Sequence, residues 1–413
     1  MLKFLNKLIF HKKLDPSKDL YINKNEQLKK FNKVWYKAIN EISLYKNWYE
    51  YYNLPMQLRS LDELENFPIL TKKMLREVFN ESNVKSSQYI VKTTGGSSGE
   101  PLSIIVDKNS INRDFNNIYL SRKNAKIDIY GKMLLIWGHS HLFGTGTSGK
   151  IKQLTRFIKD CLRRISRVSA YELSTKNVGF LVRRIINNDY AYCIGYASTF
   201  RLISKYCLLH KISLRDSGIK KIILTSETIY SQDVNDIKEV FGIEPIIEYG
   251  MAEFGVIASG YLGRLKVISS DYYVNSVENK LYITDLNNNV FPLINYSCGD
   301  YADVYFLNGS YFIGEIKGRN SSEIKIPIIN DVDFISDETR LQHFTKNIDG
   351  VIKVKFENED GLLIVKVISY LSENEFKTVF IKNISQQYDV DIQKILFKVT
   401  EEIPRTISGK IKL

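Results

Sequence analysis

The sequence predicts an α/β fold with a large N-terminal domain, which holds parallel and mixed sheets, and a small α+β C-terminal domain. Apolar residues recur at helical spacing through residues 1–85, so this region is mainly helical. Strand and helix patterns then alternate to about residue 253, an order typical of parallel β-α-β units. Past about residue 265 hairpin-linked strands take over, and a smaller β-β-α-β pattern closes the chain.

The alternating region can be assigned element by element. The segment 151–167 predicts a helix with one apolar face, formed by Leu154, Phe157, Ile158, Cys161, Leu162 and Ile165, and bases on the other face. A helix over 173–188 begins at Ser174 or Thr175. The remaining elements are strands at 132–139, 190–197, 219–227 and 244–253 and helices at 199–210 and 231–242.

The C-terminal pattern sets the predicted domain boundary. We place it near Gly318 to Ser322, which gives an N-terminal domain of residues 1–318 and a C-terminal domain of residues 319–413. The later domain contains a hairpin over 351–370 that turns at Asn358–Gly361, a helix over 372–388 and a strand over 392–403.

Charge and composition exclude some classes of partner. The chain has 413 residues and a net charge of +12, and ten lysines fall within residues 1–38 against three acids. Six more bases lie between Lys152 and Arg167. No nucleic-acid motif accompanies these bases, and aromatic residues are not interleaved with them, so a nucleic-acid partner is not expected. A membrane surface, an anionic substrate or a solvated basic face stay open.

The cysteines and the N-terminus indicate the compartment. Cys161, Cys193, Cys207 and Cys298 form no CxxC pair, which favours a reducing compartment and a cytoplasmic protein over a disulfide framework or a structural zinc site. The opening "MLKFLNKLIFHKKLDP" is basic and apolar but lacks a small-residue cleavage site, so a signal peptide is not expected. It predicts a surface helix, with peripheral contact to the inner face of the membrane as an open alternative.

A glycine- and hydroxyl-rich loop is the first candidate for a ligand site. "TTGGSSG", residues 93–99, follows a strand pattern, and its backbone N–H groups and hydroxyls suit phosphate oxygens. It is not a Walker P-loop, because no GK[ST] follows the glycines. A polar hairpin turn is the alternative interpretation.

Four later segments give this loop a context. They are "EYGMAEFG" (248–255), "INYSCGDYADV" (294–304), "GRNSSEIKI" (318–326) and "PRTISGKIKL" (404–413). In this order, the set resembles the adenylate-forming superfamily of acyl-CoA synthetases, luciferases and peptide-synthetase adenylation domains. Over roughly residues 60–413 it is most similar to the phenylacetate–coenzyme A ligase-like branch, which includes capsular polysaccharide biosynthesis proteins.

The resemblance implies a role for each matching residue, with ATP and Mg²⁺ as cofactors. Glu253 would bind magnesium, and Lys410, on a mobile lid domain, would be the catalytic residue of adenylation. Asp300 and Arg319 would bind the ribose, although a turn aspartate and a surface ion pair are the alternatives. The adenine would lie against Ser226, Glu227, Tyr249 and Gly250. The phosphates would be held by Thr93, Thr94, Gly95, Gly96, Ser97, Ser98 and Gly99.

The sequence departs from the family in places. Ala252 stands where the family usually has a threonine, so one hydroxyl contact to phosphate or acyl carboxylate is absent. Cys298 is interpreted as a packing residue and not as a nucleophile. The acyl pocket would be lined by His139, Met251 and Ala252. His139 and His141 face the same way on a strand, but a metal site there would need a third ligand.

The resemblance implies an ATP-dependent ligase that activates a carboxylic acid as acyl-AMP and transfers the acyl group to a thiol or an amine. Coenzyme A is the family's usual acceptor, and an amino sugar in capsular or O-antigen polysaccharide biosynthesis is the branch-specific acceptor. An aryl- or acyl-CoA ligase of catabolism and a non-catalytic nucleotide-binding protein are the alternatives. A homodimer is left open.

Overall fold

The structure, a computed structural model, describes residues 22–81, 89–93, 103–138, 146–170, 173, 177–317, 323–329, 334–337, 341, 344–345, 348–386 and 388–400. These residues fall into two compact units. The first draws on Tyr130–Ile246 and Asn320–Leu413, and the second on Lys7–Ile129 and Ile247–Arg319. Each unit combines segments that are far apart in sequence, and the predicted boundary after residue 318 stays a prediction.

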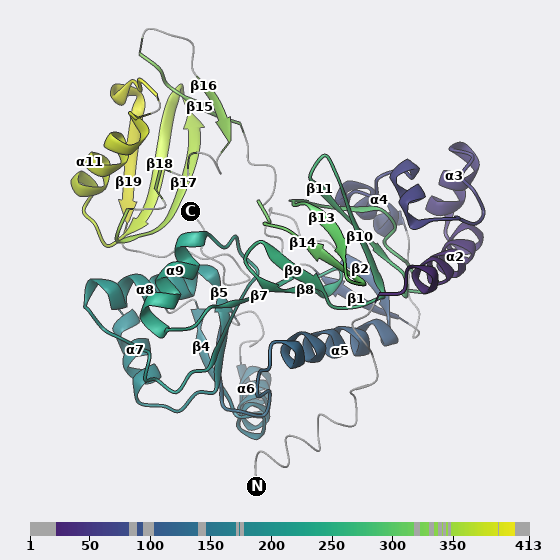
Figure 1. The fold of residues 1–413 in the computed structure, drawn as a ribbon, viewed down its shortest axis with the longest axis horizontal. Helices are drawn as coiled ribbons and strands as arrows, with labels where there is room; N and C mark the ends of the chain where they lie inside the picture. Colours follow the sequence, from purple (N-terminus) through teal and green to yellow (C-terminus); the bar gives the residue numbers. More distant parts are fainter. Residues whose placement is uncertain are drawn as a thin grey trace. The chain divides into compact units, whose positions relative to one another are not determined.

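The first unit contains the predicted parallel β-α-β region. Four parallel strands pair in the order β4–β3–β5–β6, and helices connect them along the chain. Figure 1 labels β4, β5 and the helices α6, α7, α8 and α9 of this region. Cys193, Ile194 and Leu224 on the central strands are buried, as expected for a sheet covered on both faces. The elements are β3 (Met133–Trp137), α6 (Gly146–Leu162), β4 (Ile165–Ser169), α7 (Val178–Ile186), β5 (Tyr192–Tyr196), α8 (Ala197–Leu209), β6 (Lys221–Thr225) and α9 (Ser231–Phe241).

The expected helix over 151–167 is wrong at its C-terminal end. The helix α6 ends at Leu162, and Arg164 then adopts a positive φ of 57°, which breaks the helical path. The next residues, from Ile165, form β4 and pair in parallel with β3. The following helix, α7, begins at Val178, later than predicted, and the proposed caps Ser174 and Thr175 lie outside the described residues.

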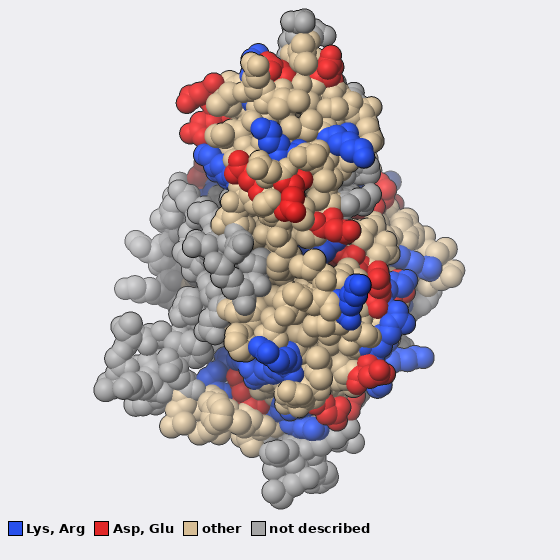
Figure 2. All heavy atoms as spheres, turned by 90° about the vertical axis from the view of Figure 1, so that its left-hand side faces the viewer, with Lys and Arg blue, Asp and Glu red and all other residues tan. Residues whose placement is uncertain are grey.

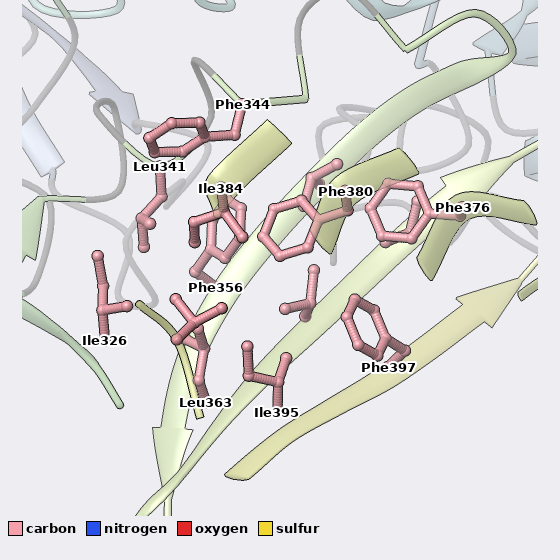
Figure 3. Packing of buried hydrophobic residues seen from close by; sticks show 14 of the residues in the cluster. Ile326, Leu341, Phe344, Phe356, Leu363, Phe376, Phe380, Ile384, Ile395 and Phe397 are labelled. Atoms are coloured by element: carbon pink, nitrogen blue, oxygen red, sulfur yellow. The ribbon is translucent and has the colours of Figure 1, made fainter. Parts of the chain in front are cut away.

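The C-terminal residues of the first unit form the predicted β-β-α-β pattern. The hairpin turns through Asp360 and Gly361, both at positive φ, and the last strand returns parallel to β18. Phe376 and Phe380 on α11 pack with Phe397 of β19 in one apolar cluster (Figure 3). The elements are β15 (Glu323–Ile326), β16 (Phe334–Asp337), β17 (Val351–Glu359), β18 (Leu362–Ser369), α11 (Glu373–Ile384), the 3₁₀ helix η4 (Ile392–Lys394) and β19 (Ile395–Thr400).

The described part of residues 22–81, in the second unit, is mainly helical, as predicted. Its aromatic core includes Phe31, Trp35, Tyr45 and Phe67, whose rings stack or meet edge to face. The elements are α2 (Lys24–Glu41), α3 (Ser43–Tyr51), η1 (Leu61–Asn66) and α4 (Lys72–Glu81), followed along the chain by the hairpin β1 (Tyr89–Thr93) and β2 (Ser103–Asp107) and by α5 (Lys108–Asn124).

The antiparallel sheets of the second unit agree with the predicted hairpins. Strands β7, β8, β9, β14 and β13 pair in that order, and β10, β11 and β12 form a separate sheet (Figure 1). Their bounds are β7 (Ile246–Met251), β8 (Gly255–Tyr261), β9 (Arg264–Val267), β10 (Tyr272–Val277), β11 (Lys280–Asp285), β12 (Tyr296–Tyr301), β13 (Val304–Leu307) and β14 (Ser310–Ile313).

Two surface properties bear on partners. On the face drawn in Figure 2, the described Lys and Arg side chains are interspersed with Asp and Glu and form no continuous basic band. In the described part of the chain, no helix has both the length and the apolar character that a bilayer crossing requires.

Candidate active site

Tyr249 and Asp300 form a partly buried polar pair in the second unit. Tyr249 lies near the end of β7 and donates its hydroxyl to Oδ2 of Asp300, on β12, at 2.8 Å. Burial, and then the neighbouring Cys298 thiol and Asp300 carboxylate, raise the pKa of Tyr249 well above its usual value. The phenol therefore stays protonated and remains a hydrogen-bond donor.

Cys298 packs beside this pair. Its Sγ lies 3.6 Å from the Tyr249 hydroxyl and donates to the carbonyl of Leu281 at 3.2 Å. Burial is the main reason that the pKa of the Cys298 thiol is raised to about 11. A thiol with such a pKa is a poor nucleophile at neutral pH, so this geometry supports a packing role.

Glu253 is a buried carboxylate that two side chains contact. The Tyr296 hydroxyl donates to its Oε1 at 2.9 Å, and the ammonium of Lys72 lies 3.9 Å from the same oxygen. The Glu253 side chain is only 4 % exposed, whereas that of Lys72 is 29 % exposed. A buried carboxylate is costly unless it is paired and hydrogen-bonded, and both partners reduce that cost.

The position of Lys72 follows from how residues 67–72 run beside β12. Leu70 donates its N–H to the carbonyl of Asn295, and its own carbonyl accepts from the N–H of Ser297. Leu70 thus forms a parallel β-bridge with Tyr296. The Asn295 side chain also donates to the carbonyl of Phe67 at 3.0 Å. These bonds carry the start of α4, and with it Lys72, to Glu253.

The carboxylate of Glu253 is a type of ligand that suits a magnesium ion. A hard cation prefers oxygen ligands, and Mg²⁺ is commonly bound by one or two carboxylates together with phosphates and water. Among the described residues no group of three or more His, Cys, Asp or Glu side chains could hold a metal. At this position Glu253 would supply one carboxylate ligand to such an ion.

The entrance to the predicted phosphate loop lies near the Glu253 turn. Thr93 ends β1 and pairs with Ser103 of β2, so the residues between them connect a hairpin. Lys92, one residue before, forms an ion pair with Asp114 of α5. Gly255, two residues after Glu253, lies against the same aspartate, because a Cβ added there would come within 2.9 Å of Cγ of Asp114. Asp114 therefore lies next to both the hairpin and the start of β8.

Close backbone packing explains why residue 250, one of the residues predicted to contact adenine, is a glycine. A Cβ on Gly250 would lie 2.3 Å from the carbonyl oxygen of Gly255, so β7 and β8 can approach here only with glycine. Gly255 itself has a φ of +73°. Met251 ends β7 partly exposed, and Ala252 is exposed in the turn before Glu253.

Ser226 and Glu227 lie in the first unit, just after β6. Ser226 has a positive φ of 70°, an uncommon conformation for a residue other than glycine. Glu227 accepts the backbone N–H of Ser198 at 2.8 Å and so caps the start of α8. Its other oxygen, Oε1, is buried and has no hydrogen-bond partner in the described part of the chain.

Solved structures with a similar fold are adenylate-forming ligases. The chain matches 2-hydroxyisobutyryl-CoA ligase, in its post-adenylation state with R3-HIB-AMP, with a TM-score of 0.67 and 16% identity over 95% of this chain and 92% of that one. It matches McyG A-PCP with phenylalanyl-adenylate at a TM-score of 0.52 and 16% identity, over 91% and 73% of the two chains. ATP-bound MatB from Rhodopseudomonas palustris gives 0.50 and 12%, over 78% and 66%.

The chain has the fold of adenylate-forming ligases. No protein-family model and no curated protein matches the sequence. The similarity in fold agrees with the superfamily that the motifs resemble.

Some predicted site residues lie in the described part of the chain and others outside it. Within the second unit, the structure brings Tyr249 to Asp300 and places Gly250 in the strand that leads to Glu253. The following lie outside the described residues: Thr94, Gly95, Gly96, Ser97, Ser98, Gly99, His139, His141, Arg319 and Lys410. Their roles stay predictions.

Three polar residues near the site were missed by sequence reasoning. Tyr296 could have been found, because residues 296, 298 and 300 alternate onto one side of a strand, and that side meets Tyr249 and Glu253. Lys72 and Asp114 carried no such signal. Each reaches the site through a contact between segments more than 100 residues apart in sequence.

Proposed function

We propose that the chain is an ATP-dependent ligase that activates a carboxylic acid as an acyl-adenylate and passes the acyl group to a thiol or an amine. In the first step a carboxylate oxygen attacks the α-phosphorus of ATP, and pyrophosphate leaves with the bonding electron pair. In the second step the acceptor attacks the acyl carbon and AMP leaves, while the acceptor's proton passes to solvent.

The observation that carries the proposal is the arrangement of Tyr249, Asp300 and Glu253 in one unit of a ligase-like fold. Tyr249 and Asp300 are hydrogen-bonded, and Tyr296, on the same strand as Asp300, holds Glu253. An aromatic ring, a ribose acceptor and a metal-binding carboxylate are the groups that a nucleoside triphosphate needs. Two of the similar structures hold an acyl- or aminoacyl-adenylate.

Each group has a distinct role in the proposal. The ring of Tyr249 would stack on adenine, with Gly250, Ser226 and Glu227 beside the base. Asp300 would accept the ribose hydroxyls, since a carboxylate oxygen can accept more than one hydrogen bond. Glu253, oriented by Tyr296, would hold Mg²⁺, which supplies neutralising charge to the phosphates when bound.

The remaining roles fall mostly on residues outside the described part. Residues 93–99 would hold the phosphates, and Arg319 would reach the ribose. Lys410, on the predicted lid domain, would place a positive charge between the carboxylate and the α-phosphate, which stabilises the charge of the transition state. Lysine suits this role because it is a compact charge on a flexible stem. His139, Met251 and Ala252 would line the acyl pocket.

The acceptor and the pathway are finer parts of the proposal. Coenzyme A is one acceptor, since the 2-hydroxyisobutyryl ligase was also captured with CoA. The motif wording favours the phenylacetate–coenzyme A ligase-like branch and an amino sugar in surface polysaccharide biosynthesis, while a catabolic aryl- or acyl-CoA ligase is the second candidate. We place the protein in the cytoplasm and leave the homodimer as an open part of the proposal.

A non-catalytic nucleotide-binding protein is the rival proposal, and Ala252 favours it. The missing hydroxyl at this position removes a contact that the family usually offers to phosphate or acyl carboxylate. Pyrophosphate release with a panel of carboxylic acids, measured beside ATP binding, separates the two. Release that depends on one class of acid supports the ligase, whereas tight ATP binding without release on any acid supports the rival.

A further inference from the structure

Tyr272, on β10, anchors the turn that carries Glu253. Its hydroxyl donates to the carbonyl of Phe254 at 2.5 Å, and its side chain is buried. The N–H of Phe254 donates to the carbonyl of Met251 at 3.2 Å and closes the turn around Glu253. Both backbone polar groups of the residue after Glu253 are therefore fixed, one within the turn and one by Tyr272.

The ring of Phe254 contacts two tyrosines. It meets Tyr272 edge to face, with ring centroids 5.7 Å apart, and its centroid lies 5.8 Å from that of Tyr296. Tyr296 is the residue whose hydroxyl donates to Glu253. The carboxylate of Glu253 and the backbone beside it are thus each held by a tyrosine, and both tyrosines pack on the same phenylalanine.

Residues of α5 hold Tyr272 in turn. The Arg113 guanidinium lies 5.2 Å from the centre of the Tyr272 ring, and the side-chain amide of Asn117 donates to the Tyr272 hydroxyl at 3.4 Å. Arg113 makes two hydrogen bonds of 2.8 Å to Asp285, the last residue of β11. Burial raises the pKa of Tyr272 above its usual value, so the phenol stays protonated and remains a donor.

We infer that Tyr272 is a positioning residue for Glu253. By fixing the backbone next to Glu253, it gives the carboxylate one orientation before a nucleotide and its metal ion bind. This inference rests on the magnesium role proposed for Glu253. Groups that orient a metal ligand without touching the metal commonly change metal affinity by about 10- to 100-fold.

A pair of tyrosine variants separates positioning from stability. Tyr272→Phe removes the hydroxyl and keeps the ring. Tyr45→Phe is the matched control, because Tyr45 is equally buried and its hydroxyl also donates to a backbone carbonyl, that of Pro292. The ring of Tyr45 packs on Trp48 of α3, outside the Glu253 turn. Both substitutions leave a buried carbonyl without its donor, so both should lower the midpoint of urea denaturation to a similar extent.

The full chain is tested for metal and nucleotide binding without urea. Electron paramagnetic resonance measures free Mn²⁺ in the presence of a non-hydrolysable ATP analogue, and isothermal titration in EDTA measures the analogue alone. We expect Tyr272→Phe to weaken Mn²⁺ binding about tenfold, the lower end of the range for a group that orients a metal ligand. The affinity for the metal-free analogue should stay the same, and Tyr45→Phe should change neither quantity.

Three results would overturn the inference. The first is Mn²⁺ binding by Tyr272→Phe as tight as by the unmodified protein. The second is equal weakening by Tyr272→Phe and Tyr45→Phe, because the effect would then follow stability. The third is weaker binding of the metal-free analogue by Tyr272→Phe, because the hydroxyl would then support the whole site.

Glu253→Gln distinguishes failure of this inference from failure of the proposed function. A Glu253→Gln variant that binds Mn²⁺ as tightly as the unmodified protein would refute the magnesium role of Glu253, and the inference with it. If Glu253→Gln weakens Mn²⁺ binding but Tyr272→Phe does not, the magnesium role stands and only the positioning role of Tyr272 is refuted.

Discussion

Single residues decide how a ligand could enter the site. Tyr249 already donates to one oxygen of Asp300, and Lys72 and Tyr296 both contact one oxygen of Glu253. A ribose must therefore share the Asp300 carboxylate with a phenol, and a metal ion must share Glu253 with an ammonium group. Both situations give measurable consequences.

Replacement of Asp300 tests the ribose assignment. Asp300→Ala is expected to weaken ATP binding by about 1.5–3 kcal/mol, because two ribose hydroxyls lose a charged acceptor. Asp303→Ala, an exposed aspartate nearby, is the control and should bind ATP normally. Isothermal titration gives the affinities. If the unmodified protein binds 2′,3′-dideoxy-ATP as tightly as ATP, Asp300 does not hold the ribose.

Lys72 is expected to compete with the metal for Glu253. Lys72→Met removes a positive charge 3.9 Å from Oε1 of Glu253. We expect Mn²⁺, in the presence of a non-hydrolysable ATP analogue, to bind on the order of tenfold more tightly, since like charges at such distances repel. Electron paramagnetic resonance of free Mn²⁺ measures this directly.

The neighbouring Lys73, which is exposed, provides the control variant Lys73→Met. It should not change Mn²⁺ binding. Unchanged or weaker Mn²⁺ binding by Lys72→Met would show that Lys72 does not compete with a metal at Glu253.

At the scale of elements, the turn between β7 and β8 positions Glu253 because the two strands approach closely at Gly250. Gly250→Ala would place a Cβ 2.3 Å from the Gly255 carbonyl oxygen. We expect a loss of unfolding free energy of about 2–3 kcal/mol and weaker ATP binding, because the turn must shift. Urea denaturation and nucleotide titration measure both effects.

Gly263→Ala is the comparison for this turn. Gly263 has a φ of +75°, but a Cβ there would meet nothing within 4 Å. Gly263→Ala should lower the free energy of unfolding by roughly 1 kcal/mol, the cost of a side chain at a positive φ, and should leave ATP binding unchanged. Similar losses in the two variants would mean that the contact with Gly255 is unimportant.

Most helices and strands could be predicted from the sequence. The residues at which they end, and the side of a helix that faces solvent, were harder to predict. Periodicity located the parallel strands and the final β-β-α-β pattern, since both depend on local spacing. It failed at Arg164, where one residue at positive φ ends α6, and it could not show that Leu154 and Phe157 face solvent. Local spacing identifies a stripe but does not tell which side of the helix the rest of the chain covers.

The candidate site could be predicted only in part, and the roles of its residues stay predictions. Tyr249, Glu253 and Asp300 lie in recognisable motifs. The pairing of Lys72 with Glu253 depends on hydrogen bonds between residues 67–72 and β12, and these join segments more than 200 residues apart. No pattern within either segment encodes that contact.

At the scale of the whole molecule, buried acidic groups make stability depend on alkaline pH. The pKa of Cys298 is raised to about 11 and that of Cys207 to about 12, mainly by burial. In the unfolded chain a thiol ionises near pH 8.5, at roughly the ordinary cysteine value. These protonated thiols therefore make their full contribution to the free energy of unfolding below that pH. The contribution is lost as the pH rises toward the pKa that each thiol has in the folded protein.

We expect the free energy of unfolding to be steady up to about pH 8 and to fall between about pH 9 and 11. Cys298 alone should account for about 2–3 kcal/mol of that fall. Denaturant titrations across this range, compared with Cys298→Ala, isolate its share. A variant with the same alkaline slope as the unmodified protein would contradict the buried thiol's role.

Formation of the acyl-adenylate is the central claim, and its detection by mass spectrometry tests it most directly. The protein is incubated with ATP, Mg²⁺ and a panel of carboxylic acids, without an acceptor. We predict acyl-AMP from one class of acid, and a drop of roughly 10²-fold in Lys410→Ala, the scale of losing one transition-state donor. A protein that binds ATP but forms acyl-AMP from no acid, across a broad panel, would contradict the account.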